Sequence, residues 1–188
     1  MGRWQPGAEE RLAAAALDLF ADRGFDEATT AEIAARAGLT ERTFFRHFAD
    51  KREVLFGQAQ QLQDLLMGRV AADPEVGQPL ETVCRALHGF GEVVAGRREP
   101  RLRQQVIDRS PELQERELIK LATLSEGLAG ALRARGVSDP GAALAAEAGI
   151  AIFKVAFSRW VAEDDRDGHE FPQLVQQSLD ALRQVACG

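Results

Sequence analysis

The sequence predicts an all-α protein, and three features support this prediction. Alanine, leucine, glutamate, glutamine and arginine, which favour helices, dominate the 188 residues. No segment alternates apolar and polar residues for long enough to indicate a half-buried strand. Apolar residues instead recur at helical spacing, as in Leu12, Ala16, Leu19 and Phe20. We expect about nine helices.

Composition places the chain among soluble globular proteins. Hydrophobic residues make up 45% and charged residues 28%, which argues against disorder. Two distant cysteines make no disulfide framework. The first six residues do not resemble a signal peptide, and no uncharged apolar run approaches the roughly 20 residues of a membrane span. We therefore expect a cytoplasmic protein that does not associate with membranes.

Basic charge is concentrated in one short segment of an acidic chain. The net charge is −6 at pH 7, but residues 36–52 contain five basic and two acidic residues. The position of positive charge matters more for recognition than the total. This segment predicts one face that binds phosphate.

Helix-start and helix-stop residues define a bundle of short helices in the first third. The first helix ends at Gly24. Residues 29–32 form a capping box, which starts a second helix ending at Gly38. Thr40 caps a third helix through Phe48. The second and third helices have the size of a helix-turn-helix.

Spacing predicts which side of the third helix is exposed. Phe44 and Phe48, with Leu39, are placed to pack inward, whereas Gly38 provides the positive φ that the turn needs. The exposed side would enter a major groove; it carries Glu41, Arg42, Thr43, Phe45, Arg46 and His47.

The remaining sequence predicts longer helices. Their expected ranges are 51–72, 80–97, 101–109, 110–136, 139–163 and 172–185. We expect two domains: a three-helix domain that contains the helix-turn-helix over residues 1–50, and a longer helical domain over residues 51–188.

The first third resembles the TetR/AcrR family of bacterial regulators over about residues 12–55. The resemblance rests on Phe20-Ala21-Asp22-Arg23-Gly24-Phe25, Thr29-Thr30, Ile33-Ala34, Ala37-Gly38-Leu39-Thr40, Arg42-Thr43-Phe44-Phe45-Arg46-His47-Phe48 and Asp50-Lys51. The later helices match the family in number, length and order only.

This resemblance implies that the second and third helices bind DNA. Base edges would be approached by Arg42 and Thr43, since arginine forms a two-pronged hydrogen bond with guanine. The implied phosphate contacts are Thr30, His47 and Lys51, and Arg46 suits either role. Phe45 stands where the family commonly has tyrosine and cannot donate to a phosphate, although it can pack on a sugar or a thymine methyl group. For Arg36 and Arg52, solvated surface and phosphate contact are equally good interpretations.

The resemblance also implies that residues 1–50 form a DNA-binding domain and residues 51–188 an effector-binding and dimerisation domain, with helices from about residue 59 to 135 forming the part that binds a small-molecule effector. Its candidate residues are mostly apolar and favour a lipophilic or aromatic ligand; they are Leu62, Leu66, Leu87, His88, Phe90, Arg103 and Phe153. The alternative for each apolar residue is an ordinary place in the core. We expect no cofactor and no metal: Glu81, Cys84 and His88 share a helix face, but no further histidine or cysteine completes a ligand set.

The last two long helices carry apolar stripes that suggest a four-helix dimer contact. The candidate interface residues are Ile150, Phe157, Trp160, Leu179 and Leu182, with burial inside the subunit as the alternative. A dimer would place its two recognition helices roughly 34 Å apart, at successive major grooves of a palindrome.

The sequence therefore predicts a homodimeric repressor that leaves a palindromic operator when a small effector binds. Effector binding would shift the helix at residues 51–72 and with it the DNA-binding heads. The alternatives are an all-α enzyme and a protein-binding adaptor. The sequence has no paired carboxylates in a metal pattern, no Gly-rich phosphate loop and no nucleophile motif, so we do not expect an enzyme.

Overall fold

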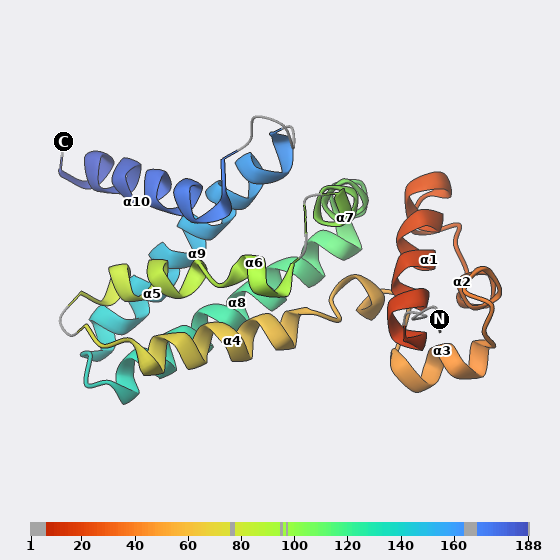
Figure 1. Ribbon diagram of the computed structural model, residues 1–188, viewed down its shortest axis with the longest axis horizontal. Coiled ribbons are helices and arrows are strands. Elements are labelled where there is room, and N and C mark those ends of the chain that lie inside the picture. The colour runs from red at the N-terminus through yellow and green to blue at the C-terminus, as the bar shows by residue number, and fades with distance from the viewer. Residues whose placement is uncertain (1–6, 76–77, 95, 97, 164–168, 188) are drawn as a thin grey trace, which may run out of the picture. The chain divides into compact units, whose positions relative to one another are not determined.

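The structure is a computed structural model that describes residues 7–75, 78–94, 96, 98–163 and 169–187. Throughout these ranges the regular structure is helical, with ten α-helices and one short 3₁₀ helix and no strand (Figure 1). The predicted all-α class is confirmed. The chain divides into two compact units. The N-terminal unit comprises the chain up to Gln58 and Arg101–Glu117, and the C-terminal unit comprises Ala59–Pro100 and the chain from Leu118 onward.

The N-terminal unit is built from α1 (Ala8–Arg23), α2 (Thr30–Arg36), α3 (Glu41–His47) and the 3₁₀ helix η1 (Glu53–Leu55). Most of α7 (Arg98–Asp108) and the first residues of α8 (Pro111–Ala134) belong to it too. Its core contains Phe20, Ile33 and Phe44, which are at most 1% exposed. Apolar side chains at helical spacing thus hold α1, α2 and α3 together.

The predicted caps are present at α2 and α3. The Thr29 hydroxyl accepts a hydrogen bond from the Glu32 backbone N–H at 3.2 Å, and the Glu32 carboxylate accepts one from the Thr29 N–H at 3.0 Å. The Thr40 hydroxyl accepts from the Thr43 N–H at 3.2 Å. Gly38 has a φ of 67°, which confirms the positive φ expected in the turn.

Two expected helices are interrupted. The helix expected from Lys51 starts only at α4 (Ala59–Ala72), because Asp50 accepts hydrogen bonds from the N–H groups of Arg52 and Glu53 and closes a tighter turn before η1. The helix expected from residue 80 to 97 is split into α5 (Pro79–Leu87) and α6 (Phe90–Val93). Residues 88 and 89 bond three residues back, in 3₁₀ fashion. Residue 97 lies outside the described ranges.

The C-terminal unit packs α9 (Asp139–Ala162) against α5 and α10 (Phe171–Cys187) (Figure 1). Helix α9 approaches α5 closely at Gly149, where an added Cβ would lie 2.4 Å from Val83 Cγ1. By length and composition α9 would pass as a membrane span, with a mean hydropathy of 1.5. Its buried side chains lie in the core of this unit, as expected of a core helix.

Candidate DNA interface and effector site

The outer face of α3 presents two arginines that have no carboxylate partner among the described residues. Phe44 and Phe48 point inward, at 0% and 5% exposure, so the opposite side of α3 faces solvent. Arg42 makes no hydrogen bond or ion pair with any residue that the structure describes. Arg46 contacts His47 Nε2 at 3.4 Å. Unpaired guanidinium groups on an exposed helix are available to an anionic partner.

Thr30 and Thr43 are engaged inside the helix-turn-helix. The Thr30 hydroxyl donates to the Glu41 carboxylate at 2.5 Å, joining the start of α2 to the start of α3. The hydroxyls of Thr43 and Thr40 lie 3.0 Å apart. The Thr30–Glu41 contact helps to set the relative position of the two helices, whereas the Thr43–Thr40 contact lies within the start of α3. His47 is exposed, and its Nδ1 lies 4.0 Å from a Glu9 carboxylate oxygen.

Lys51, a predicted phosphate contact, is engaged within the chain. Its ammonium group donates to the backbone carbonyls of Phe25 at 2.8 Å, Asp26 at 3.1 Å and Ala28 at 3.3 Å. It also lies 4.3 Å from the centroid of the Phe25 ring. A lysine has three N–H donors, and all three are used within the chain. In this arrangement Lys51 holds the α1–α2 loop, and its predicted phosphate contact stays a prediction.

Arg36 and Arg52, for which the sequence left two interpretations open, also form ion pairs within the chain. Arg36 pairs with Asp18 of α1 at 3.6 Å. Arg52 pairs with Asp50 at 2.5 Å and with Glu112 at 2.9 Å. The hydrogen bond from Arg52 holds the pKa of Asp50 below its usual value. Both arginines therefore brace the N-terminal unit.

Sequence reasoning missed Arg11, which stabilises the turn of the helix-turn-helix. Its guanidinium group donates to the Ala37 carbonyl, directly before the turn glycine. A Cβ at Gly38 would lie 3.0 Å from Arg11 Nη2. The signal that could have revealed it is a lone arginine next to Leu12, which begins the apolar stripe of α1.

Arg103, a candidate pocket residue, has its hydrogen-bond partners in a different unit from the one that contains the other candidates. It belongs to the N-terminal unit, where its Nε donates to the Leu55 carbonyl at 2.7 Å and its Nη1 pairs with Glu117 at 3.2 Å. Its guanidinium group also lies 4.9 Å from the Phe56 ring centroid. Desolvation holds its pKa below the usual arginine value. With Arg116, which pairs with Glu53, it ties η1 to α7 and α8.

The apolar pocket candidates come together in the core of the C-terminal unit. Leu66 and Leu87 are fully buried, and Leu62 packs against the same core. The Phe90 and Phe153 rings meet at 5.4 Å. His88 is exposed at the end of α5, and partial desolvation, followed by the charge of Arg69, lowers its pKa.

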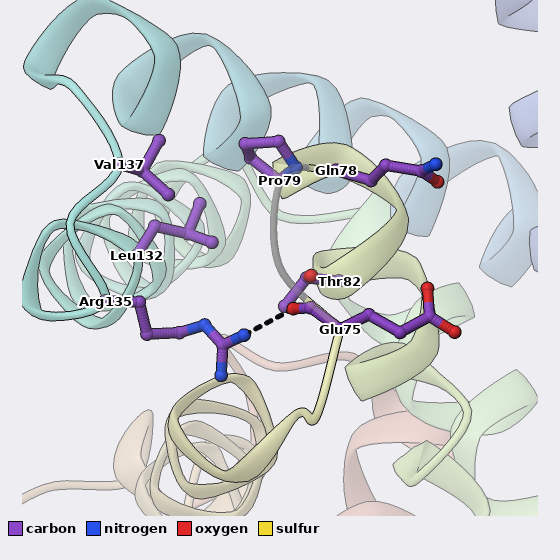
Figure 2. Close-up of a pocket in the computed structure, with 7 residues that line it drawn as sticks. All are labelled: Glu75, Gln78, Pro79, Thr82, Leu132, Arg135 and Val137. Atoms are coloured by element: carbon purple, nitrogen blue, oxygen red, sulfur yellow. Dashed lines mark hydrogen bonds between the residues drawn. The ribbon is translucent and has the colours of Figure 1, made fainter.

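The hollow shown in Figure 2 involves none of these candidates. Its volume is about 20 Å³, which is room for about one water molecule. Its lining residues are Glu75, Gln78, Pro79, Thr82, Leu132, Arg135 and Val137. Arg135 donates to the Asp73 and Glu75 carbonyls at 2.5 Å. This contact fixes the loop after α4.

The dimer candidates divide into buried and partly buried side chains. Ile150, Trp160 and Leu179 are 7%, 6% and 2% exposed within their own subunit, and Phe157 and Leu182 pack against the same core. Ile150, Trp160 and Leu179 thus help to fill the subunit interior, which is the alternative considered above. Phe157 and Leu182 are only partly buried, and the predicted dimer contact stays a prediction. The exposed apolar side chains of these helices are instead Leu144, Val155 and Val185, at 71%, 53% and 83%.

Phe157 and Trp160, two of the dimer candidates, belong to an aromatic cluster. Five rings from α6, α9 and α10 pack with neighbouring centroids 4.6 to 6.1 Å apart, mostly edge to face or tilted. They are Phe90, Phe153, Phe157, Trp160 and Phe171. Such a cluster buries a large apolar area with specific geometry.

The helix face with Glu81, Cys84 and His88, which was considered above as a metal site, carries side chains with other roles. Glu81 accepts a hydrogen bond from Arg183 at 2.5 Å. Burial raises the pKa of the Cys84 thiol to about 12, so it stays protonated at neutral pH and is a poor metal ligand. Within the described residues, no group of three His, Cys, Asp or Glu side chains is placed to hold a metal ion.

Two family profiles match this chain. The profile described as bacterial regulatory proteins of the tetR family matches residues 12–57. The profile described as the MftR C-terminal domain matches residues 77–186, which is more than half of the chain.

Curated relatives and solved structures agree with these matches. The transcriptional regulator TcmR of Streptomyces glaucescens is 26% identical over 185 residues, covering 93% of this chain and 82% of TcmR. A mycofactocin biosynthesis transcriptional regulator, MftR of Mycobacterium tuberculosis, is 30% identical over 133 residues, covering 69% of this chain and 66% of MftR. A SmeT–triclosan complex has a TM-score of 0.61 and 21% identity, covering 93% of this chain and 90% of SmeT.

These matches and the helix-turn-helix geometry lead to one assignment. The family consists of transcriptional regulators that bind DNA and small-molecule effectors, are generally dimeric and are generally not enzymes. The chain belongs to the tetR family of bacterial regulatory proteins, with a C-terminal domain of the MftR type.

Proposed function

We propose that this chain is a cytoplasmic homodimeric repressor that leaves a palindromic operator when a small lipophilic or aromatic effector binds. The observation that carries the DNA-binding part is the free cationic face of α3, where Arg42 and Arg46 have no carboxylate partner among the described residues. Arg36, Lys51 and Arg52, by contrast, are held by partners within the chain. Arg42 suits a guanine base edge, and Arg46 a phosphate or a base.

The DNA-binding proposal is tested by selecting sites from random double-stranded DNA and measuring affinity across a salt series. Arg42→Ala is expected to relax base preference at one position of each half-site and to cost about 1–3 kcal/mol there. Arg133→Ala in the C-terminal unit is the matched control, since it also removes one exposed arginine. Wild-type protein that selects no sequence would refute the proposal.

The aromatic cluster supports a lipophilic or aromatic effector. Its rings offer faces and edges suited to stacking with a ligand ring, and the adjacent break between α5 and α6 is a place where the backbone can rearrange. Phe90→Ala is expected to weaken effector-dependent release while leaving operator affinity without effector unchanged. Arg133→Ala, which removes an exposed arginine that pairs with Asp139 in the same unit, is the comparison variant.

The release mechanism that we propose is a population shift between a DNA-binding form and a released form. An effector that binds the released form more tightly lowers operator affinity by that difference. Helix α4 follows the N-terminal unit directly in the chain, which supports its role as the moving element. Unchanged operator affinity in the presence of a bound effector would refute this mechanism.

The exposed apolar residues of α9 and α10 support the homodimer. Leu144 and Val155 lie on α9, and Val185 lies on α10. Exposed side chains of this kind on two neighbouring helices are suited to an isologous four-helix contact. Val155→Glu is expected to shift the protein to monomer in sedimentation equilibrium, whereas Lys154→Glu on the same helix is the charge control.

A further inference from the structure

Phe45 places an apolar ring in the middle of the cationic face of α3. The side chain is 54% exposed, although the preceding Phe44 is fully buried. Arg42 stands three residues before it and Arg46 directly after it. Residues three apart are neighbours on a helix surface. Any partner that meets both arginines therefore also meets the Phe45 ring.

The ring is held in a defined orientation. Its centroid lies 5.4 Å from that of Phe44, and the two ring planes meet at 84°, which is the edge-to-face arrangement that aromatic rings prefer. Phe44 is itself fixed in the core of the N-terminal unit. A side chain that is already positioned loses little conformational entropy on binding.

The chemistry of the ring restricts what it can recognise. A phenyl ring has no hydrogen-bonding atom, so it cannot anchor a phosphate oxygen. The bases of the major groove present hydrogen-bonding groups and one protruding apolar group, the C5 methyl group of thymine. Base pairs without thymine have no methyl group in the major groove.

We propose that Phe45 packs against the C5 methyl group of a thymine in each operator half-site. The inference rests on the DNA-binding function proposed above and adds a base preference to it. Helix positions three apart have Cβ atoms about 5–6 Å apart, and successive bases on one strand are about 3.4 Å apart. The thymine therefore lies within about two base steps of the guanine that Arg42 contacts.

The test uses the site selected from random double-stranded DNA, with each thymine replaced in turn by uracil. This replacement removes only the methyl group and keeps the Watson–Crick pair. At one thymine of each half-site, uracil is expected to weaken wild-type binding about fourfold, the effect of exposing one methyl-sized group. Phe45→Ala is expected to bind thymine and uracil sites equally, whereas Phe45→Tyr keeps the preference because it keeps the ring.

Each outcome decides the proposal. The proposal would be overturned if uracil weakened binding of wild type and Phe45→Ala equally. It would also be overturned if the selected sites had no thymine within two base pairs of the guanine whose recognition depends on Arg42. Failure of the wild type to select any DNA would instead refute the DNA-binding function itself. Because Phe45 is exposed, circular dichroism and Tm are expected to match those of wild type for both variants.

Discussion

Replacing Lys51 with methionine separates a structural role from a phosphate contact. The ammonium group donates to three carbonyls of the α1–α2 loop, and methionine keeps the side-chain length but has no donor. A net hydrogen bond that involves a charged group contributes about 1.5–3 kcal/mol when buried. Lys51 is only partly buried, so water can replace some of these bonds. We expect a total loss of about 1–3 kcal/mol.

Two measurements, the Tm and the salt dependence of operator binding, distinguish a structural role of Lys51 from a phosphate contact. For a chain of this length, about 1 kcal/mol corresponds to a Tm change of about 2–4 °C, so Lys51→Met is expected to lower Tm by several degrees. The salt dependence of operator binding should keep its slope, because no phosphate contact is lost. Arg42→Ala is the matched variant, for which we expect an unchanged Tm and a relaxed base preference.

The opposite pattern would refute the structural assignment. If Lys51→Met left Tm unchanged and reduced the salt slope by about one counterion per subunit, then the ammonium group would be leaving the loop to bind a phosphate. Measuring Tm with and without operator DNA completes the comparison, since a bound ligand adds stability to the folded form.

Three further predictions follow from local geometry. Gly38→Ala should destabilise the protein by about 1–2 kcal/mol in urea unfolding, because φ is 67° and the new Cβ would lie 3.0 Å from Arg11 Nη2; equal stability would contradict it. The Cys84 thiol, with a pKa of about 12, should resist iodoacetamide at pH 8 until denaturant is added, and modification at the rate of free cysteine would be the opposing result. The pKa of Asp50 is lowered by Arg52, so its contribution to stability is present above the unfolded pKa and is lost as pH falls through the folded pKa; Asp50→Asn should therefore flatten the acid side of the stability profile.

Sequence reasoning predicted the elements that local signals determine. The capping residues Thr29 and Thr40 and the turn at Gly38 act within a few residues, so the starts of α2 and α3 follow from them. The continuous helix expected from Lys51 was wrong, because the Asp50 side chain closes a tight turn that competes with an α-helical start. Long-range side-chain partners have no such local signal.

Arg103 and Trp160 show what periodicity leaves undetermined. An apolar stripe indicates that a helix face is buried, but not whether its own subunit or a partner covers it. Trp160 lies in the core of its own subunit, with Phe90 and Phe171. Arg103 interacts with Leu55 and Glu117, residues 48 and 14 positions away. Only the folded chain brings these groups together.

The partners of the basic residues give a quantitative expectation for DNA binding. Of the five Lys and Arg residues between residues 36 and 52, three are held by partners within the described part of the chain, and two, Arg42 and Arg46, have no carboxylate partner there. A dimer would therefore bring four such arginines to DNA through α3, which sets a slope of log K against log salt of about −3.6 at most from these groups. A measured slope near this value would mean that α3 provides most of the electrostatic binding. A much steeper slope would require phosphate contacts outside α3, and alanine replacement of the remaining exposed basic residues would locate them.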